Sequence, residues 1–441
     1  MVHIQGNNRN QIRMLSLEQM VEPESMVRII DAFVDMLELE KFDFNYFKLN
    51  KEGRPPYHPS TMMKLYLYGY QNSLRTCRKL EKACKTNIEM MWLINEQRPH
   101  YKTIANFRKD NAKAFKSVFR YFVALLKDWK LIDGKTIAID SFKIRAQNSL
   151  KNNFNERKVK RHIDYIDKRI AEYEQALDKE FDETTKEKLE HNHQKKENYR
   201  KIQEQLKQSG DGQISMTDHD SKAVVFQRNS VKVGYNVQAV SDSKNKLLIA
   251  ADTGDVNDTK ALAVMVEKAK ENIGEVKNVL ADKGYHSGRE LKACEELDVT
   301  TFVSPKESSS IKKNPDYAME SFIYDKQDDT YTCPAGELMG TNGRMYNKTL
   351  KKGRKSYQVK HYKTKACNGC HLRVQCTSNK HGRLIERTEY QQYVTNNNDR
   401  VNQNPNYYRQ RQQIIEHQFG TLKRHWHFDY TLTRGKEKST R

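Results

Sequence analysis

The sequence contains no long apolar run. No stretch approaches the roughly 18 consecutive apolar residues that a membrane-spanning helix requires, and the N-terminal segment Met1-Val2-His3-Ile4-Gln5-Gly6 has no apolar signal core. We therefore expect a cytoplasmic protein with no membrane partner. Apolar residues make up only 37 % of the chain, below the roughly 45–50 % of typical globular proteins. Its 23 Tyr and 16 Phe still provide enough aromatic side chains for hydrophobic cores.

Acidic residues are scarce relative to basic ones. The chain has 57 Asp and Glu residues against 78 Lys and Arg, a formal net charge of +21 over 441 residues. A basic excess of this size is typical of nucleic-acid-binding proteins, although solvated lysines on an ordinary surface produce the same excess. At ~100–200 residues per domain, the length predicts about two to four domains.

The cysteines are too few and too scattered for a disulfide framework. There are 7 of them, an odd number, and no secretion signal accompanies them. Cys333 is followed by Cys367-Asn368-Gly369-Cys370 and then by Cys376. A CxxC pair with two further cysteines can offer four thiolates to a tetrahedral zinc ion, with His371 or His381 as a replacement ligand. Reduced thiols packed in a small β insertion are the alternative.

Residues 1–130 have a helical pattern and are predicted to form an N-terminal DNA-binding domain. The helical stretch 73–84 is separated by Lys85-Thr86-Asn87 from a short helix through Met90-Met91-Trp92. Two short helices joined by a tight turn are typical of a helix-turn-helix. An ordinary helix pair in a small bundle is the alternative. The helix N-caps expected along the whole chain are Ser60, Thr103, Thr184 and Ser287.

Residues 131–304 predict a mixed α/β domain. Within it, residues 155–208 carry apolar side chains at helical spacing and predict a Lys/Glu-rich helical hairpin inserted into the domain. Residues 305–400 are Cys-rich and predict a β insertion, and residues 401–441 predict a helix that closes the core. Short apolar strands with intervening helices are expected at 135–142, 233–240, 247–251, 279–282 and 299–303.

Two acids come at the carboxyl ends of short apolar strands. They are Asp140, in Lys135-Thr136-Ile137-Ala138-Ile139-Asp140, and Asp282, in Val279-Leu280-Ala281-Asp282. In open α/β sheets this edge is where ligands bind. A carboxylate beside an apolar strand is unfavourable unless it is paired or binds a metal. An Asp that caps a turn or meets a Lys is the alternative for each.

Glu416 is a third candidate acid. It lies on a predicted helix at 407–426 that Pro405 starts. At ~100° per residue, Arg409 and Lys423, seven positions on either side of Glu416, share its face. An acid between two cations suits a site near a phosphate or a metal, whereas a surface helix with salt bridges is the alternative. Three acids from separate elements suit two Mg²⁺ ions ~3.5–4 Å apart, as in phosphodiester cleavage.

Three motifs carry a resemblance to a known family. They are Ala138-Ile139-Asp140-Ser141, Ala281-Asp282-Lys283-Gly284-Tyr285 and Ile415-Glu416-His417-Gln418-Phe419-Gly420-Thr421-Leu422-Lys423. In order and spacing the chain resembles bacterial insertion-sequence transposases of the DDE class, which have an RNase H-like catalytic domain. Further similar segments are Ile4-Gln5-Gly6, Asn8-Arg9-Asn10-Gln11, Val27 to Val34, Gly53 to Pro59, Lys102 to Lys109, and Gly234-Tyr235-Asn236-Val237-Gln238.

The resemblance implies roles for individual residues. Asp140, Asp282 and Glu416 would bind two Mg²⁺ ions, for which Mn²⁺ can substitute. The expected contacts to the DNA end are Tyr408, either Arg409 or Arg411, Lys423 and Arg424. Relatives often show Tyr, two residues, Arg, three residues, Glu. Arg411 keeps the spacing of two residues after Tyr408, whereas the helical-face argument favours Arg409.

The resemblance also implies a function. A transposase of this class would bind terminal inverted repeats in double-stranded DNA, cleave at the element ends with two metal ions and transfer the 3′-OH strand to target DNA. It would self-associate on DNA and be nucleoid-associated in a prokaryotic cytoplasm. Relatives continue past residue 436 with a further helical stretch, so a catalytically dead, C-terminally truncated DNA-binding remnant is one alternative. A structure-specific, metal-dependent nuclease is the other.

Overall fold

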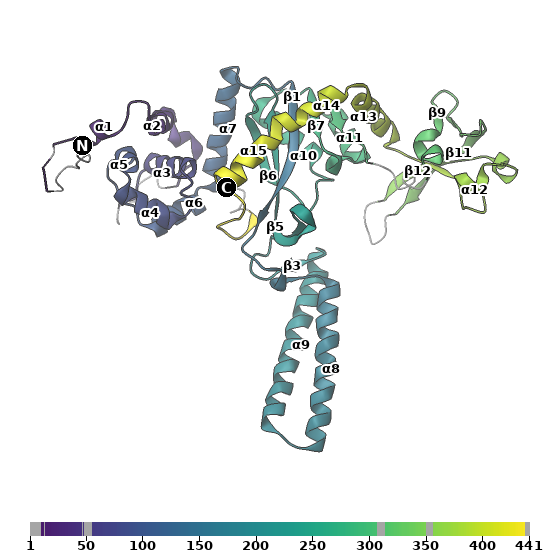
Figure 1. Ribbon diagram of the computed structural model, residues 1–441, viewed down its shortest axis with the longest axis horizontal. Coiled ribbons are helices and arrows are strands. Elements are labelled where there is room, and N and C mark those ends of the chain that lie inside the picture. Colours follow the sequence, from purple (N-terminus) through teal and green to yellow (C-terminus); the bar gives the residue numbers. More distant parts are fainter. Residues whose placement is uncertain are drawn as a thin grey trace, which may run out of the picture. The chain divides into compact units, whose positions relative to one another are not determined.

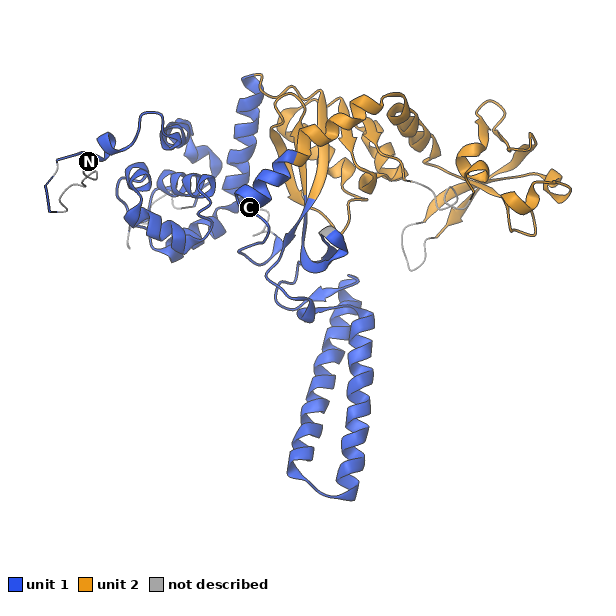
Figure 2. Cartoon of the chain, viewed as in Figure 1, with its two compact units in different colours: residues 1–129, 142–237, 417–441 blue, residues 130–141, 238–416 orange. Residues whose placement is uncertain are grey.

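A computed structural model describes residues 10–12, 14–45, 47, 55–306, 314–349 and 356–436 (Figure 1). The chain divides into two compact units, one of residues 1–129, 142–237 and 417–441 and one of residues 130–141 and 238–416 (Figure 2). The domain boundaries predicted from the sequence stay a prediction. Among the described residues, no helix combines the length and apolarity needed to cross a bilayer. Residues 4–9 and 48–54, which carry part of the family resemblance, lie outside the described residues.

The predicted helical character of the N-terminal region is confirmed. Its helices are α1 (Leu17–Met20), α2 (Met26–Met36), α3 (Pro59–Gln71), α4 (Cys77–Thr86), α5 (Ile88–Leu93), α6 (Tyr101–Asp110) and α7 (Ala112–Asp128). Helix α3 lies in the core, where its Met62, Met63, Leu65 and Tyr66 are almost fully buried. The hydrophobic core of this region therefore forms around α3.

Both predicted N-caps in this region are wrong. Helix α3 is capped by His58, whose Nδ1 accepts from the Ser60 amide at 3.2 Å. Helix α6 is capped by His100 in the same way, rather than by Thr103. Pro59 occupies the first turn of α3, where its fixed φ favours the start of a helix, so this helix begins before Ser60.

The predicted pair of short helices is present as α4 and α5. Only Asn87 separates them, and its Oδ1 caps α5 by accepting from the Met90 amide at 2.8 Å. The helix predicted to follow Thr103 is instead two helices, because Asn111 interrupts it. The buried Asn111 side chain donates to the Phe107 carbonyl at 2.8 Å, which stops α6 there.

A mixed sheet forms the centre of the fold, as predicted. Its strands follow the order β4-β5-β1-β7-β8, and β6 pairs with β5. Strands β1, β7 and β8 are parallel to one another, whereas β4 is antiparallel to β5. This arrangement is consistent with an RNase H-like domain. The elements are β1 (Thr136–Arg145), β4 (Lys222–Val225), β5 (Val231–Asp242), β6 (Leu248–Thr253), α10 (Leu262–Ile273), β7 (Asn278–Ala281), α11 (Gly288–Glu296) and β8 (Thr300–Val303).

The predicted helical hairpin is confirmed as α8 (Glu156–Lys179) and α9 (Glu183–Ser209), which lie side by side (Figure 1). The cap of α9 is Asp182 rather than Thr184, because the Asp182 carboxylate accepts from the Thr184 and Thr185 amides at 3.2 and 3.0 Å. Ser287 occupies the N-cap position of α11, as predicted, but its side chain makes no capping hydrogen bond.

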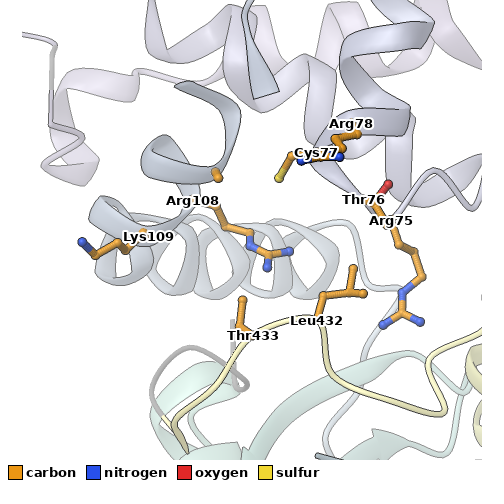
Figure 3. Close-up of a pocket in the computed structure, with 9 residues that line it drawn as sticks. Arg75, Thr76, Cys77, Arg78, Arg108, Lys109, Leu432 and Thr433 are labelled. Carbon is orange, nitrogen blue, oxygen red and sulfur yellow. The ribbon is translucent and has the colours of Figure 1, made fainter. Parts of the chain in front are cut away.

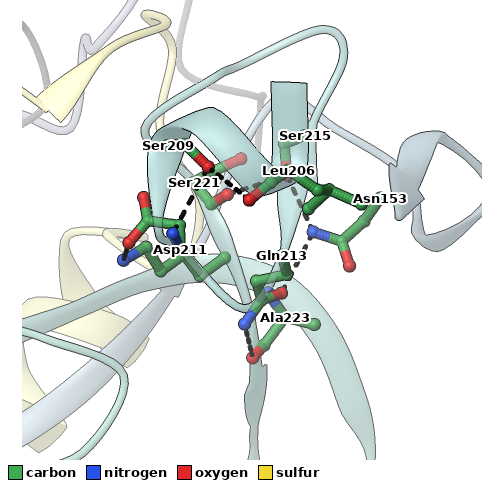
Figure 4. Close-up of polar contacts among 9 residues, drawn as sticks. Asn153, Leu206, Ser209, Asp211, Gln213, Ser215, Ser221 and Ala223 are labelled. Carbon is green, nitrogen blue, oxygen red and sulfur yellow. Dashed lines mark hydrogen bonds and ion pairs between the residues drawn. The ribbon is translucent and has the colours of Figure 1, made fainter. Parts of the chain in front are cut away.

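Polar contacts fix the base of the hairpin (Figure 4). There the short strands β2 (Asn153–Phe154) and β3 (Ile214–Ser215) pair antiparallel. The side-chain amide of Asn153 donates from Nδ2 to Gln213 Oε1 at 3.1 Å and to Ser215 Oγ at 2.9 Å. Gln213 in turn accepts from the Ala223 amide of β4 at 2.7 Å. The hairpin is thus joined to the mixed sheet through β4.

The predicted Cys-rich β insertion is confirmed as an antiparallel sheet of order β13-β12-β11-β10-β9. We call it the Cys-rich sheet. Its elements are β9 (Ile323–Asp325), β10 (Thr330–Thr332), β11 (Leu338–Lys348), β12 (Tyr357–Lys363), α12 (Arg373–Cys376) and β13 (Ile385–Thr388). Helical structure follows in α13 (Gln391–Gln403), α14 (Pro405–Arg411), a π-helical turn (Gln412–Glu416), α15 (His417–Gly420) and a second π-helical turn (Thr421–His425).

Candidate active site

Asp140 and Asp282 lie at equivalent positions of neighbouring strands. Strands β1 and β7 are parallel, and their last register pair joins Ile139 to Ala281. Asp140 and Asp282 are the next residues, so the two carboxylates come at the same level of the sheet. Strand β1 continues beyond Asp140, further than predicted, but its pairing with β7 ends here. Asp282 follows directly on β7 and accepts a hydrogen bond from the Gly284 amide at 2.7 Å.

Helix α14 is anchored on the same part of the sheet and leads to Glu416. The hydroxyl groups of Tyr407 and Thr136 share a hydrogen bond at 2.7 Å. The Tyr407 ring also packs edge-on against Phe302 of β8, with 4.8 Å between the ring centroids. Because these contacts hold α14 against β1 and β8, the π-helical turn that ends at Glu416 starts from a defined position.

Arg411 links Glu416 to Asp140. Its Nη1 donates to Asp140 Oδ2 at 2.9 Å, and its Nη2 donates to Glu416 Oε1 at 3.0 Å. The Arg411 side chain is 10 % exposed, against 18 % for Asp140 and 47 % for Glu416. Water therefore screens the pair with Asp140 less than the pair with Glu416. One guanidinium thus brings together two of the three predicted acids.

The helical-face argument for Arg409 is wrong because the helix is not regular at this point. On an α-helix at ~100° per residue, residues five apart diverge by about 140°. A π-helical turn is wider and brings residues i and i+5 to one side. Arg411 therefore meets Glu416 across the π-helical turn, whereas Arg409 is exposed. The turn accommodates the one residue by which this chain exceeds the family spacing between Arg and Glu.

The other predicted DNA contacts lie along the same helical segment. Tyr408 is half-buried and precedes Arg411 by three residues. Lys423 and Arg424 belong to the second π-helical turn, within the first compact unit. The Lys423 ammonium lies over the ring of Phe142, 5.5 Å from its centroid, and Arg424 is exposed. Contact of these side chains with DNA stays a prediction.

The Asp140 carboxyl group has an unusual environment for an acid. Burial raises its pKa to about 6, and the Asp282 charge acts in the same direction. The Ser141 amide, which donates to Asp140 Oδ1 at 2.7 Å, opposes this rise, as does Arg411. Asp140 is therefore an acid that gains from a nearby cation, which is what a carboxylate ligand of a metal ion requires.

Asp258, Gln238 and Tyr285 form a hydrogen-bonded series that reaches the turn carrying Asp282, and sequence reasoning gave none of them a role. A Cβ atom at Gly284 would lie 2.8 Å from Asp282 Oδ1 and 3.2 Å from Asp258 Oδ2, so both carboxylates crowd this glycine. Asp258 Oδ1 accepts a hydrogen bond from the side-chain Nε2 of Gln238 at 2.6 Å. Gln238 Oε1 in turn accepts from the buried Tyr285 hydroxyl. Gln238 and Tyr285 both lie in quoted family segments, which was the available signal.

No metal-binding group is preformed among the described residues: no three His, Cys, Asp or Glu side chains stand in an arrangement that could hold a metal ion. At the carboxylates, Arg411 pairs with both Asp140 and Glu416. The four cysteines of the Cys-rich sheet line one small cavity without forming a disulfide.

Comparison with protein families identifies the chain. A family model described as Transposase DDE domain matches residues 132–441, which is well over half of the sequence. The chain belongs to the DDE transposase family. A second model, described as Transposase domain (DUF772), matches residues 15–110 of this transposase. Members of the DDE family are metal-dependent phosphoryl-transfer enzymes that act in DNA transposition. Searches of curated proteins and of solved structures gave no match to the chain.

The N-terminal region of the transposase has a basic pocket of about 360 Å³ (Figure 3). Its cationic lining residues are Arg75, Arg78, Arg108 and Lys109. The pocket lies at the start of α4, whose N-cap Thr76 also lines it. Several cations around one hollow, beside the amide groups of a helix start, suit a phosphate oxygen. The pocket is a candidate contact for a nucleic-acid backbone.

The chain after Glu416 belongs to the first unit of the transposase and is hydrogen-bonded to other residues of that unit. The Arg145 amide donates to the Asp429 carbonyl at 2.9 Å, and the Thr431 amide donates to the Arg145 carbonyl at 2.8 Å. Arg75 donates to the His427 carbonyl and, at 2.7 Å, to the Tyr430 carbonyl. These bonds tie the described C-terminal segment to β1 and to the basic pocket.

Proposed function

We propose that this transposase binds the terminal inverted repeats of its element, cleaves DNA at the element ends and joins the freed 3′-OH to target DNA. One observation carries the proposal. Asp140 and Asp282 follow a shared register on parallel strands, and Arg411 brings Glu416 to Asp140. Because the chain belongs to the DDE family, we assign Asp140, Asp282 and Glu416 as its three catalytic acids.

The donor set fits the divalent metal ions of the family. Carboxylate oxygens are the ligands that Mg²⁺ and Mn²⁺ prefer. Asp140, Asp282 and Glu416 would hold two such ions, and a positive group already sits between two of these acids in the form of Arg411. When bound, the ions would supply Lewis-acid stabilisation of the charge that develops at phosphorus.

Arg411 and the residues around Asp282 would orient the reaction. A guanidinium pairs with phosphate as well as with carboxylate, so Arg411 can exchange Asp140 or Glu416 for a DNA phosphate. Side-chain hydrogen bonds link Tyr285 to Gln238 and Gln238 to Asp258, and they support the loop that carries Asp282. Because phosphoryl transfer depends mainly on positioning and charge, such supports contribute to the rate without touching the reacting atoms.

The experiment uses a supercoiled plasmid that carries the element with its native flanking DNA. Purified protein and the Asp282→Asn variant are incubated with Mg²⁺, and breaks are mapped at single-nucleotide resolution. Asn retains an oxygen that can accept from the Gly284 amide, so the loop is kept while the charge is lost. Asp298→Asn is the matched control, because Asp298 is exposed and has the left-handed backbone that Asn tolerates.

We expect breaks at two inverted-repeat boundaries and a joined donor–target product with the wild type and with Asp298→Asn. The Asp282→Asn variant should bind the ends but not cut them. Wild-type cutting by Asp282→Asn would contradict the triad. Tight binding without breaks in any sample would indicate a catalytically dead remnant, and breaks without a joined product would indicate a nuclease.

A further inference from the structure

Four cysteines from separate parts of the Cys-rich sheet surround one small cavity. Cys333 follows β10, Cys367 and Cys370 lie in the turn after β12, and Cys376 ends α12. All four are half-buried and line a cavity of about 30 Å³. A volume of this size holds little more than a single water-sized sphere. The four cysteine residues thus line a space suited to one ion rather than to an organic ligand.

The backbone of this region is shaped to place two of the thiols. After Cys333, the Gly336 amide donates to the Cys333 carbonyl at 2.9 Å, and Gly336 has a φ of +82° that closes a tight turn. Gly382 has a φ of +85°, and a Cβ atom there would lie 2.7 Å from the Cβ atom of Cys367. The chain therefore uses the left-handed conformation of glycine beside Cys333 and Cys367.

Two arginines also line the cavity. Arg383 donates from Nη1 to the Cys376 carbonyl at 3.3 Å, and Arg373 donates from Nη2 to the Lys380 carbonyl at 2.6 Å. Four thiolates around a divalent ion carry a net charge of −2, which two guanidinium groups balance.

The Cys-rich sheet has a small buried core. Its buried core consists of Phe322, Tyr331, Met339, Tyr362 and Ile385. Cys333 and Cys376 pack against this core, so the cavity is continuous with it. Small domains with so few buried residues commonly depend on a disulfide or a structural metal. None of the described cysteines forms a disulfide.

We propose that Cys333, Cys367, Cys370 and Cys376 bind one structural Zn²⁺ ion. Thiolates select zinc over the hard ions that suit carboxylates, and four of them complete a closed tetrahedral site with no position for substrate. Among the described residues, these side chains line the cavity without forming a ligating group. Zinc binding would therefore require the thiol groups to reorient toward the ion. Neither His371 nor His381 is among the described residues that line the cavity, so the ligand set is four cysteines.

The test begins with the full-length protein purified without added metal. Elemental mass spectrometry should find about one zinc per chain. Replacement of zinc by Co²⁺ should give the thiolate-to-cobalt charge-transfer band and the visible bands of a tetrahedral site. Thiol alkylation followed by peptide mapping should show all four cysteines protected together, and all four should become reactive together when a chelator is added.

Variants separate ligation from folding. Cys370→Ser and Cys376→Ser should each lose the cobalt bands and most of the bound zinc. Cys294→Ala is the matched control, because Cys294 is buried in α11 and lines no part of this cavity. It should keep both signals. If a Ser variant does not fold, the alkylation pattern of the wild type still decides.

Several results would overturn the proposal. They are an absence of zinc and of cobalt bands, cysteine reactivity that the chelator leaves unchanged, a disulfide between any two of the four, and iron in place of zinc. Loss of zinc from Asp282→Asn as well as from the Ser variants would also contradict a site separate from the carboxylates. Because the readouts are metal content and thiol reactivity, they are independent of DNA cleavage and of the proposed function.

Discussion

Asp140 is the residue whose titration distinguishes the acids of the candidate site. Burial raises its pKa to about 6 from the ordinary value of 3.8. The folded protein therefore holds this proton more tightly than the unfolded chain does. Its contribution to stability is present below about pH 4 and is lost as the pH rises through about 6. At neutral pH the buried Asp140 carboxylate is destabilising, and the Ser141 amide and Arg411 offset only part of this cost.

This linkage predicts how Asp140→Asn changes stability with pH. In chelator-containing buffer, the free energy of unfolding of the variant should rise relative to the wild type between about pH 4 and pH 7, by up to about 3 kcal/mol. Urea denaturation at several pH values measures the difference. A difference that stays constant with pH would mean that Asp140 titrates normally. Asp298→Asn, at an exposed position, is the control and should show no such trend.

A second residue-scale prediction concerns Gly382 in the Cys-rich sheet. Gly382→Ala should destabilise this sheet by about 1–3 kcal/mol, because Ala disfavours a positive φ and its Cβ would collide with Cys367. Gly369→Ala is the matched control, since Gly369 has a negative φ and open space around it. Limited proteolysis of the two variants compares them. Equal cleavage would show that the turn at Gly382 tolerates a side chain.

At the scale of elements, the π-helical turn before Glu416 decides which arginine meets the acid. Deletion of the exposed Gln413 should convert the π-helical turn into a regular α-helix. Arg411 would then precede Glu416 by four residues, so both side chains would stay on the same face of the helix. We expect this variant to retain plasmid cleavage. Deletion of the exposed Gln410 is the control, because it rotates Arg411 relative to the preceding helix and should abolish cleavage. Loss of activity in both would show that the wide turn itself is required.

The sequence predicted elements wherever their pattern is local. The helical hairpin and the strands that precede Asp140 and Asp282 follow from apolar periodicity within each segment. His58 and His100 were missed as caps because histidine is not among the preferred capping residues. The π-helical turn was missed because a seven-residue spacing assumes 3.6 residues per turn. The supporting contacts of Asp258 depend on tertiary structure and leave no periodic signal.

For the whole molecule, the net charge of +21 predicts binding to DNA that depends strongly on salt. Arg78→Ala and Lys109→Ala, at the basic pocket, should each reduce the slope of log affinity against log salt by about 1 and weaken binding to all sequences alike. Fluorescence anisotropy between about 50 and 200 mM salt measures this slope. Lys168→Ala, at an exposed position on α8, is the control. Unchanged slopes for the pocket variants would exclude the pocket from backbone contact.

The ion pairs of Arg411 with Asp140 and Glu416 also bear on how DNA cleavage is controlled. An enzyme that breaks DNA is dangerous if its machinery is always assembled. Here Arg411 already pairs with two of the three acids, so we expect a metal ion that binds Asp140 and Glu416 to compete with this internal cation. A DNA phosphate weakens that competitor by offering Arg411 another partner. We therefore expect the metal ion and the DNA end each to favour binding of the other at this site.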